Sequence, residues 1–280
     1  MTVYGFDDVT VTLGGTTAVD RVTLDIRPGV VTALVGGDGA GKTTLLRCLA
    51  GRVAPTHGRV RSAPLRHTGV LTADPPGYGD LTVAQNVAFA AQVRGLARPV
   101  ARERTAALLD ATGLRDATGR LADQLSGGMR RKLGFALATL HEPALLLLDE
   151  PTTGVDPVSR TDLWRLMAAA ARDGTAVVVA TTYLDEAERC PEVLALDRGQ
   201  VLATGDPDAI IARVRRGLYR CPTPGPRDRS WRRGVDWRVW APDAPPPDDA
   251  TPVTPDLEDA VVVAMLERTP DAPQRVTEVV

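Results

Sequence analysis

The sequence has few cysteines, and no apolar run in it approaches the length needed to span a bilayer. Its three cysteines, Cys48, Cys190 and Cys221, are scattered at spacings that fit neither a disulfide framework nor a zinc site. This usage indicates a reducing compartment. The first residues read directly as strand-like sequence rather than as a secretion signal. We therefore expect a cytosolic protein that reaches any membrane only through a partner.

An excess of charge of one sign is also missing. The chain has 33 Lys and Arg residues against 35 Asp and Glu residues, a formal net charge of −2. This balance gives no sign of the basic surface typical of nucleic-acid-binding proteins, so we expect no nucleic-acid partner. Besides Lys42, the only lysine is Lys132, within Arg-Arg-Lys-Leu. The guanine-reading motif Asn-Lys-x-Asp is therefore absent, which argues against a GTPase of the G-protein type.

What the sequence does have is an apolar run at 30–35, a glycine-rich loop and then a helical pattern. The loop has the frame Gly36-x-x-x-x-Gly41-Lys42-Thr43, which is that of a phosphate-binding loop. Its glycines let the backbone wrap a phosphate, and the N–H groups that open the helix face the anion. Lys42 adds a positive charge for the β- and γ-phosphates, and Thr43 offers a hydroxyl to Mg²⁺. We predict that a nucleoside triphosphate is bound by Gly36, Gly37, Asp38, Gly39, Ala40, Gly41, Lys42, Thr43 and Thr44.

The rest of the 280-residue chain, 44% of which is apolar, has room for one large α/β domain and a small appendage. The run at 145–148 reads as a fully buried strand of the parallel type. Strands are expected near 3–13, 19–26, 30–35, 58–62, 68–71, 145–148, 176–180, 193–196 and 200–202. Helices are expected near 44–49, 83–94, 98–111, 129–140, 161–171, 185–189 and 257–266.

The composition changes after about residue 214. Nine prolines lie between residues 222 and 255, which is typical of a linker. Trp231, Trp237 and Trp240 lie in the same stretch, and so much apolar surface favours a packing partner over full disorder. We expect a domain over 1–214, followed over 215–280 by a proline-rich linker and a small, irregular C-terminal subdomain.

Three further motifs follow the loop in a fixed order. They are Leu125-Ser126-Gly127-Gly128-Met129, Asp149-Glu150-Pro151 directly after the buried strand, and Gly154-Val155-Asp156-Pro157. Together with the phosphate-binding loop, they make residues 1–214 resemble the nucleotide-binding subunit of ATP-binding-cassette (ABC) transporters. The resemblance implies a P-loop α/β core, an N-terminal antiparallel β subdomain, a helical subdomain around 81–140, and ATP with Mg²⁺ as ligands.

The resemblance also implies roles for single residues. Asp149, with Thr43, holds Mg²⁺, and Glu150 orients the attacking water as general base beside Lys42. Ser126, Gly127 and Gly128 form a signature that contacts the γ-phosphate of ATP bound to a second cassette. Two cassettes would then pair head to tail, as a homodimer or a heterodimer, beneath an integral-membrane permease subunit at the cytoplasmic face.

Two stretches, 181–188 and 80–86, look like the drug- and polysaccharide-export branch of the family, whose permeases are of the ABC-2 type. Residues 255–259 are similar to a motif near the C-terminus of those subunits. The sequence Gly37-Asp38-Gly39, with the histidine-less Thr181-Thr-Tyr183, is similar to the first cassette of tandem-cassette exporters.

Three positions depart from the family pattern. Leu13 stands where an aromatic ring usually stacks on adenine, Ala73 replaces a glutamine, and Thr182 replaces a histidine. Stacking is worth about 1–3 kcal/mol per base, so binding should weaken unless Tyr4 or Phe6 compensates. A missing proton-handling group costs about 10²–10⁴ in rate. We expect this chain's own nucleotide site to be impaired.

The chain's three histidines are not expected to replace the one missing at Thr182, because His57, His67 and His141 are expected at surface or turn positions. Two alternatives stay open at this point. One is a non-transport ABC protein that acts on ribosomes or DNA, although such proteins usually carry two cassettes or a coiled-coil insertion. The other is a regulatory ATP-binding module without turnover, against which the retained Glu150 argues.

Overall fold

The computed structural model describes residues 3–74, 77–214 and 217–268. Its centre is a six-stranded sheet in which all neighbours are parallel except β8 and β9. Every residue of its strands at 31–35, 145–149 and 176–181 is buried, since helices and a second sheet cover the two faces of the central sheet. In spatial order the strands are β5 (Thr68–Leu71), β6 (Leu145–Asp149), β7 (Ala176–Thr181), β3 (Val31–Val35), β8 (Glu192–Asp197) and β9 (Gln200–Gly205).

One face of the central sheet is covered by helix α1 (Lys42–Leu49) and an antiparallel sheet of order β2-β1-β4. Alternate residues of the antiparallel strands, such as Val9, Val11 and Val22, are fully buried against this face. The strands are β1 (Tyr4–Leu13), β2 (Thr16–Ile26) and β4 (His57–Arg61). The strand β2 begins three residues before the predicted residue 19, directly after the Gly14-Gly15 turn.

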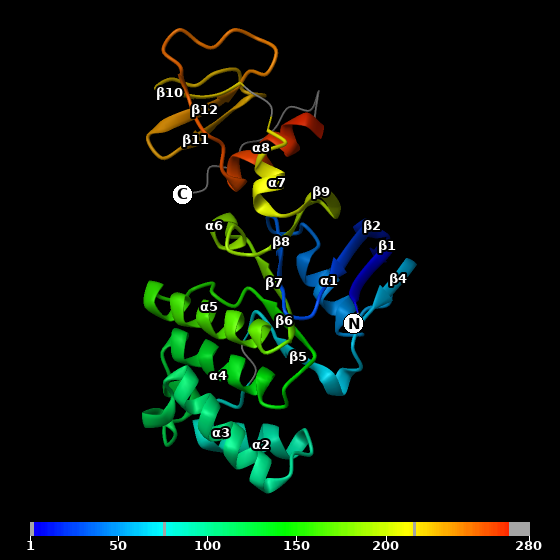
Figure 1. Ribbon diagram of the computed structural model, residues 1–280, viewed down its shortest axis with the longest axis vertical. Helices are drawn as coiled ribbons and strands as arrows, with labels where there is room; N and C mark the ends of the chain where they lie inside the picture. Colours follow the sequence, from blue (N-terminus) through cyan, green and yellow to red (C-terminus); the bar gives the residue numbers. More distant parts are fainter. Residues whose placement is uncertain (1–2, 75–76, 215–216, 269–280) are drawn as a thin grey trace.

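The other face packs on helices from distant parts of the sequence (Figure 1). They are α5 (Pro157–Arg172), α6 (Leu184–Ala187), α7 (Pro207–Ile211) and α8 (Leu257–Arg268). Helix α5 begins four residues before the predicted residue 161, because Asp156 caps it and Pro157 suits its first turn. No helix of the described ranges is long and apolar enough to cross a membrane.

A helical subdomain with its own apolar cluster lies at one end of the molecule (Figure 1). It contains α2 (Val83–Val93), α3 (Arg98–Thr112) and α4 (Gly127–Thr139). A capping box between Thr82 and Gln85 starts α2. Helix α4 joins the subdomain to the central sheet. Its Leu133 packs in the helical cluster, whereas Phe135 packs in the main core, the apolar cluster between the central sheet and α5. Three short 3₁₀ turns occur at Leu65–His67, Arg115–Ala117 and Ala122–Gln124.

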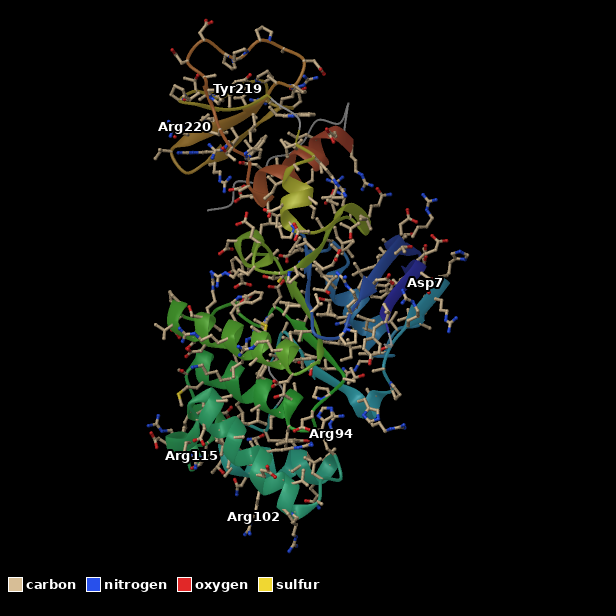
Figure 2. All side chains as sticks on the ribbon, viewed as in Figure 1. Asp7, Arg94, Arg102, Arg115, Tyr219 and Arg220 are labelled. Atoms are coloured by element: carbon tan, nitrogen blue, oxygen red, sulfur yellow. The ribbon has the colours of Figure 1, made fainter. Side chains whose placement is uncertain are left out.

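The opposite end of the molecule is more regular than the proline-rich linker and irregular subdomain that the sequence leads us to expect. An antiparallel sheet of order β11-β12-β10-β13 forms there, with Tyr219 and Arg220 on β10 (Figure 2). Prolines fall mainly in the connecting loops, while the tryptophans lie on β11 and β12. The strands are β10 (Leu218–Cys221), β11 (Ser230–Arg233), β12 (Asp236–Trp240) and β13 (Thr251–Pro252). The expected boundary at 214/215 falls at residues 215–216, outside the described residues.

Helix α8 ties this C-terminal sheet to the central domain. Its Leu257 packs in the main core, whereas Val263 packs against Trp240 of the sheet. Asp259, which is fully buried, lies 2.9 Å from Arg233 Nη1 and 3.4 Å from Arg238 Nε. Burial raises the pKa of the Asp259 carboxyl, and the two arginine charges act in the opposite direction. The C-terminal sheet therefore depends on a desolvated carboxylate that the arginines must compensate.

We predict that Asp259→Ala destabilises the protein by about 3–5 kcal/mol, because Arg238 loses its buried counter-ion and Arg233 keeps only the more exposed Asp256 and Glu258. Glu258→Ala is the matched control: its side chain is 47% exposed and lies 3.4 Å from Arg233, so its loss should cost about 0–1 kcal/mol. Urea denaturation followed by tryptophan fluorescence measures both variants. Equal losses would contradict the role given to the buried carboxylate.

Candidate functional site

The phosphate-binding loop connects the buried strand β3 to helix α1. Its backbone has positive φ angles of 151° at Gly36, 76° at Gly39 and 105° at Gly41, a region that glycine tolerates. A Cβ added at Gly36 would lie 2.3 Å from the carbonyl oxygen of Leu196, and one at Gly41 would lie 2.8 Å from that of Ala18. At Gly36 and Gly41 the loop therefore lies against two neighbouring backbone segments that leave no space for a side chain.

Lys42 begins α1 and is only 6% exposed. Its ammonium donates to the carbonyl oxygens of Gly36 at 2.6 Å and Gly37 at 3.1 Å, and lies 3.6 Å from Glu150 Oε1. The lysine charge is thus held inside the loop, beside the carboxylate that follows strand β6. This is the position from which it can meet phosphate oxygens enclosed by the loop.

Thr43 and Asp149 form the second pair at the site. The Thr43 hydroxyl lies 3.1 Å from Asp149 Oδ1 and 3.0 Å from Oδ2. Asp149 is the last residue of β6 and is 8% exposed. One hydroxyl and one carboxylate beside a phosphate-binding loop match the few oxygen ligands that proteins offer Mg²⁺ in nucleotide sites. The residues present therefore fit a magnesium ion.

Glu150 follows in a left-handed backbone conformation, with φ of 49°. Such a conformation costs a non-glycine residue about 1–3 kcal/mol and is found often at functional sites. Two hydrogen bonds hold the residue: its N–H donates to the carbonyl of Ala180 at 2.9 Å, and the Thr153 hydroxyl donates to Oε2 at 2.8 Å. The second carboxylate oxygen is the one near Lys42. Glu150 is thereby held with its carboxylate at the loop.

The other loop residues differ in their surroundings. Gly37 and Asp38 are exposed, Ala40 is buried, and Thr44 is partly buried on the first turn of α1. The Cβ of Ala40 would lie 2.8 Å from a Cβ at Gly36, so Ala40 also contributes to the tight turn. The structure thus brings together the predicted loop, Asp149 and Glu150.

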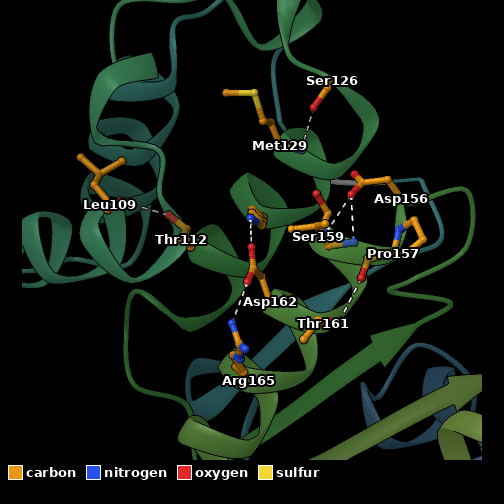
Figure 3. A network of polar contacts seen from close by, with 12 residues as sticks. Leu109, Thr112, Ser126, Met129, Asp156, Pro157, Ser159, Thr161, Asp162 and Arg165 are labelled. Carbon is orange, nitrogen blue, oxygen red and sulfur yellow. Dashed lines mark hydrogen bonds and ion pairs between the residues drawn. The ribbon is translucent and has the colours of Figure 1, made fainter.

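The predicted signature lies on another element. Ser126 is exposed and caps α4, where its hydroxyl oxygen accepts a hydrogen bond from the N–H of Met129 at 3.3 Å (Figure 3). Gly127 is exposed, whereas Gly128 is buried, and a Cβ at Gly128 would lie 2.4 Å from Ser159 Oγ. Among the described residues, no hydrogen bond or ion pair joins Ser126 to the phosphate-binding loop.

The signature packs instead on the start of α5. Asp156 caps this helix, since its Oδ1 accepts from the N–H groups of Val158 at 3.1 Å and Ser159 at 2.9 Å (Figure 3). These hydrogen bonds hold the pKa of Asp156 below its usual value. A fixed α5 terminus therefore supports the signature while leaving Ser126 and Gly127 open to solvent.

Sequence reasoning missed a buried carboxylate beneath the site. Glu186 on α6 is fully buried, and its Oε2 accepts from the hydroxyls of Thr152 at 2.9 Å and Thr181 at 3.0 Å. Arg160 lies 3.5 Å from Oε1 and stacks over the Tyr183 ring at 4.8 Å. Glu186 thus connects the segment after Glu150 to the end of β7. The only sequence signal was its place in the stretch 181–188.

The three departures from the family pattern are all exposed positions. Leu13, at the end of β1, is 45% exposed, and Ala73 and Thr182 are exposed as well. Tyr4 and Phe6, considered as replacements for the missing ring, are 7% and 0% exposed within the core. Neither ring is therefore available to stack on a base.

The three histidines differ more than their sequence contexts indicate. His57 and His67 are exposed, as expected, but His141 is half-buried and its Nε2 lies 3.2 Å from the carbonyl oxygen of Thr68. Burial lowers the pKa of His141 to about 4. His141 is therefore a neutral packing residue near physiological pH.

The family model described as "ABC transporter" matches residues 19–153. The chain is 43% identical over 203 residues to the "Probable multidrug ABC transporter ATP-binding protein YbhF" of Escherichia coli, covering 69% of this chain and 35% of that protein. It is 40% identical over 205 residues to the "Daunorubicin/doxorubicin resistance ATP-binding protein DrrA" of Streptomyces peucetius, covering 68% and 61%.

A third relative is matched over more of its own length. This is the "Nod factor export ATP-binding protein I" of Paraburkholderia xenovorans, 34% identical over 218 residues, which cover 74% of this chain and 72% of the relative. A solved "Structure of ATP binding subunit of ABC transporter" is 27% identical with a TM-score of 0.69, over 76% of this chain and 93% of that one. The predicted α/β fold with a P-loop NTPase core is confirmed by this likeness.

We predict weak binding of both ATP and GTP, because no aromatic ring stands at Leu13 and Tyr4 and Phe6 are buried. Leu13→Tyr should strengthen binding of a fluorescent ATP analogue by about ten- to a hundredfold. Leu13→Met, which adds no ring, is the matched control. Competition binding measures all three proteins. An unchanged affinity in Leu13→Tyr would show that the base does not stack at this position.

Proposed function

Because the chain belongs to the ABC transporter family, we propose that it binds and hydrolyses ATP to energise an ABC-2-type membrane exporter. The observation that carries the proposal is the meeting of Lys42, Thr43, Asp149 and Glu150 at the glycine loop. The chain spans about a third of the length of the E. coli relative, so the whole protein's activity and partners form part of the proposal.

Each group has a distinct task in this proposal. Lys42 exchanges its carbonyl partners for β- and γ-phosphate oxygens. Thr43 and Asp149 would hold Mg²⁺, which would neutralise part of the charge on the phosphates. Glu150, held in place by Ala180 and Thr153, orients the attacking water and accepts its proton.

We infer that turnover at this chain's own site is weak. Ala73 cannot offer an amide to the metal and the water, and Thr182 cannot offer an imidazole to the γ-phosphate. A missing proton-handling or positioning group lowers a rate by about 10²–10⁴. Leu13 weakens nucleotide binding in addition. The site is then better suited to holding Mg·ATP than to hydrolysing it.

The signature indicates a second cassette as partner. Ser126 and Gly127 are exposed at the N-terminus of α4, where backbone N–H groups favour an anion, and no contact joins Ser126 to this chain's own loop in the described residues. We propose that they contact ATP on the second cassette. The pair would bind a permease subunit at the cytoplasmic face, with residues 1–214 as the cassette and 215–280 as an appendage.

A regulatory ATP-binding module without turnover is the second candidate. Ala73 and Thr182 favour it, since neither side chain can take part in hydrolysis. Glu150 favours the first candidate, because a strained backbone and two hydrogen bonds hold a general base beside Lys42. A phosphate-release assay with Glu150→Gln as control distinguishes the two.

Lys42→Ala should weaken binding of a fluorescent Mg·ATP analogue by about a hundredfold or more, because it removes the charge at the β- and γ-phosphates. The matched control is Lys132→Ala, which removes the other lysine. That residue is paired with Asp162 at 2.6 Å on α5, so its loss should leave the affinity near that of wild type. Unchanged affinity in Lys42→Ala would mean that the loop is not the nucleotide site.

Ser126→Arg in this chain should block the opposite site of the cassette pair, where its signature contacts the partner's nucleotide. If the partner is the more competent cassette, this change should reduce ATPase activity more than Glu150→Gln does. Phosphate release from the native pair measures both variants. Equal losses would indicate two equivalent sites, and a larger loss from Glu150→Gln would overturn the impairment of this chain's own site.

A further inference from the structure

The segment that carries Ala73 is held by a residue from another element. Strand β5 ends at Leu71, and the carbonyl oxygen of Thr72 accepts a hydrogen bond from Arg131 Nη1 at 3.2 Å. Arg131 lies on α4, the helix that Ser126 caps, and its side chain is half-buried. A guanidinium thus fixes the backbone directly before the position at which the family's amide side chain is missing.

The charges around Arg131 belong to the nucleotide site. Asp74, Glu150 and Asp149 are near enough for their negative charges to raise the pKa of Arg131, while burial, the larger effect, lowers it. Leu71 of β5 pairs with Leu148 of β6, so the 72–74 segment leaves the sheet beside Asp149 and Glu150. Lys42 lies 3.6 Å from Glu150 Oε1, and Arg131 brings a second positive charge to this edge from α4.

We propose that Arg131 is a positioning residue of this chain's own nucleotide site, which holds the 72–74 segment beside Asp149 and Glu150 in place of the amide that Ala73 lacks. The inference rests on the proposed function. A segment without a polar side chain at residue 73 needs another device to fix it, and a half-buried hydrogen bond from a charged group provides one. Because α4 begins at the signature, the same contact connects the surface for the second cassette with this chain's own site.

The chain offers a matched control for this arginine. Arg94, at the end of α2, is also half-buried, and burial also lowers its pKa. Its Nη2 donates to the carbonyl oxygen of Thr68 at 3.4 Å, at the opposite end of the same strand β5 (Arg94 is labelled in Figure 2). Arg131→Met therefore removes a contact directly after β5, and Arg94→Met removes contacts to Thr68 at its start and to Leu65, but only the first change lies at the nucleotide site.

Hydrogen–deuterium exchange of the nucleotide-free protein tests the contact without turnover. Arg131→Met should raise exchange at residues 72–74 by about tenfold or more and leave the Thr68 end unchanged. Arg94→Met should do the reverse. Arg131→Lys, which keeps a charged donor, should restore at least part of the protection. Unchanged exchange at 72–74 in Arg131→Met would overturn the proposal.

Steady-state ATPase assays test the role in a cassette pair that carries Ser126→Arg in this chain, so that the opposite site is blocked and only this chain's own site turns over. Arg131→Met should lower kcat by about tenfold or more, while the affinity for a fluorescent ATP analogue, which depends on Lys42, changes less than about threefold. Arg94→Met should leave kcat as in wild type. Ala73→Gln should raise kcat by a larger factor in Arg131→Met than in the protein that keeps Arg131, because the added amide then also helps to fix the 72–74 segment.

The outcomes separate this inference from the proposed function. If Lys42→Ala leaves nucleotide binding intact, the proposed function fails. If Lys42→Ala abolishes binding but Arg131→Met and Arg94→Met have equal kcat, the positioning role fails alone. An equal rise in kcat from Ala73→Gln with and without Arg131 would also overturn it, since the two residues would then act independently.

Discussion

The close approach of backbone to backbone at the phosphate-binding loop is the constraint on which the rest of the structure depends. At Gly36 and Gly41, a Cβ would meet the carbonyl oxygens of Leu196 and Ala18 at 2.3 and 2.8 Å. The end of β8 and the start of β2 can lie this near the loop only because both positions are glycine. The loop therefore fixes where the antiparallel sheet meets the central sheet, as well as where a phosphate can lie.

The register of the central sheet then determines which groups reach the loop. Val35 pairs with Thr181, and Asp149 pairs with Ala180, so β3, β6 and β7 end at one edge. Parallel strands present their carboxyl ends together, and ligands of open α/β sheets bind at such an edge. Glu150 follows directly and is held by the Ala180 carbonyl, which places acid and lysine side by side.

Local patterns in the sequence predicted the elements whose cause is local. The buried strand at 145–148 and the helix near 83–94 depend on apolar runs and a capping box, and both are present. The C-terminal sheet was not predicted, because its prolines indicate a linker and its pairing joins strands as far apart as β10 and β13. In the site, Glu186 and Arg131 were missed for the same reason, since their roles depend on contacts between distant segments.

The distribution of burial separates the parts of the site that the fold requires from those it does not. Lys42, Asp149 and Glu186 are buried and hydrogen-bonded, so their replacement would leave unpaired polar groups in the interior. Leu13, Ala73 and Thr182 are exposed, and surface substitutions away from special features usually change stability by less than about 0.5 kcal/mol. The fold therefore tolerates the loss of an aromatic ring, an amide and an imidazole at these positions.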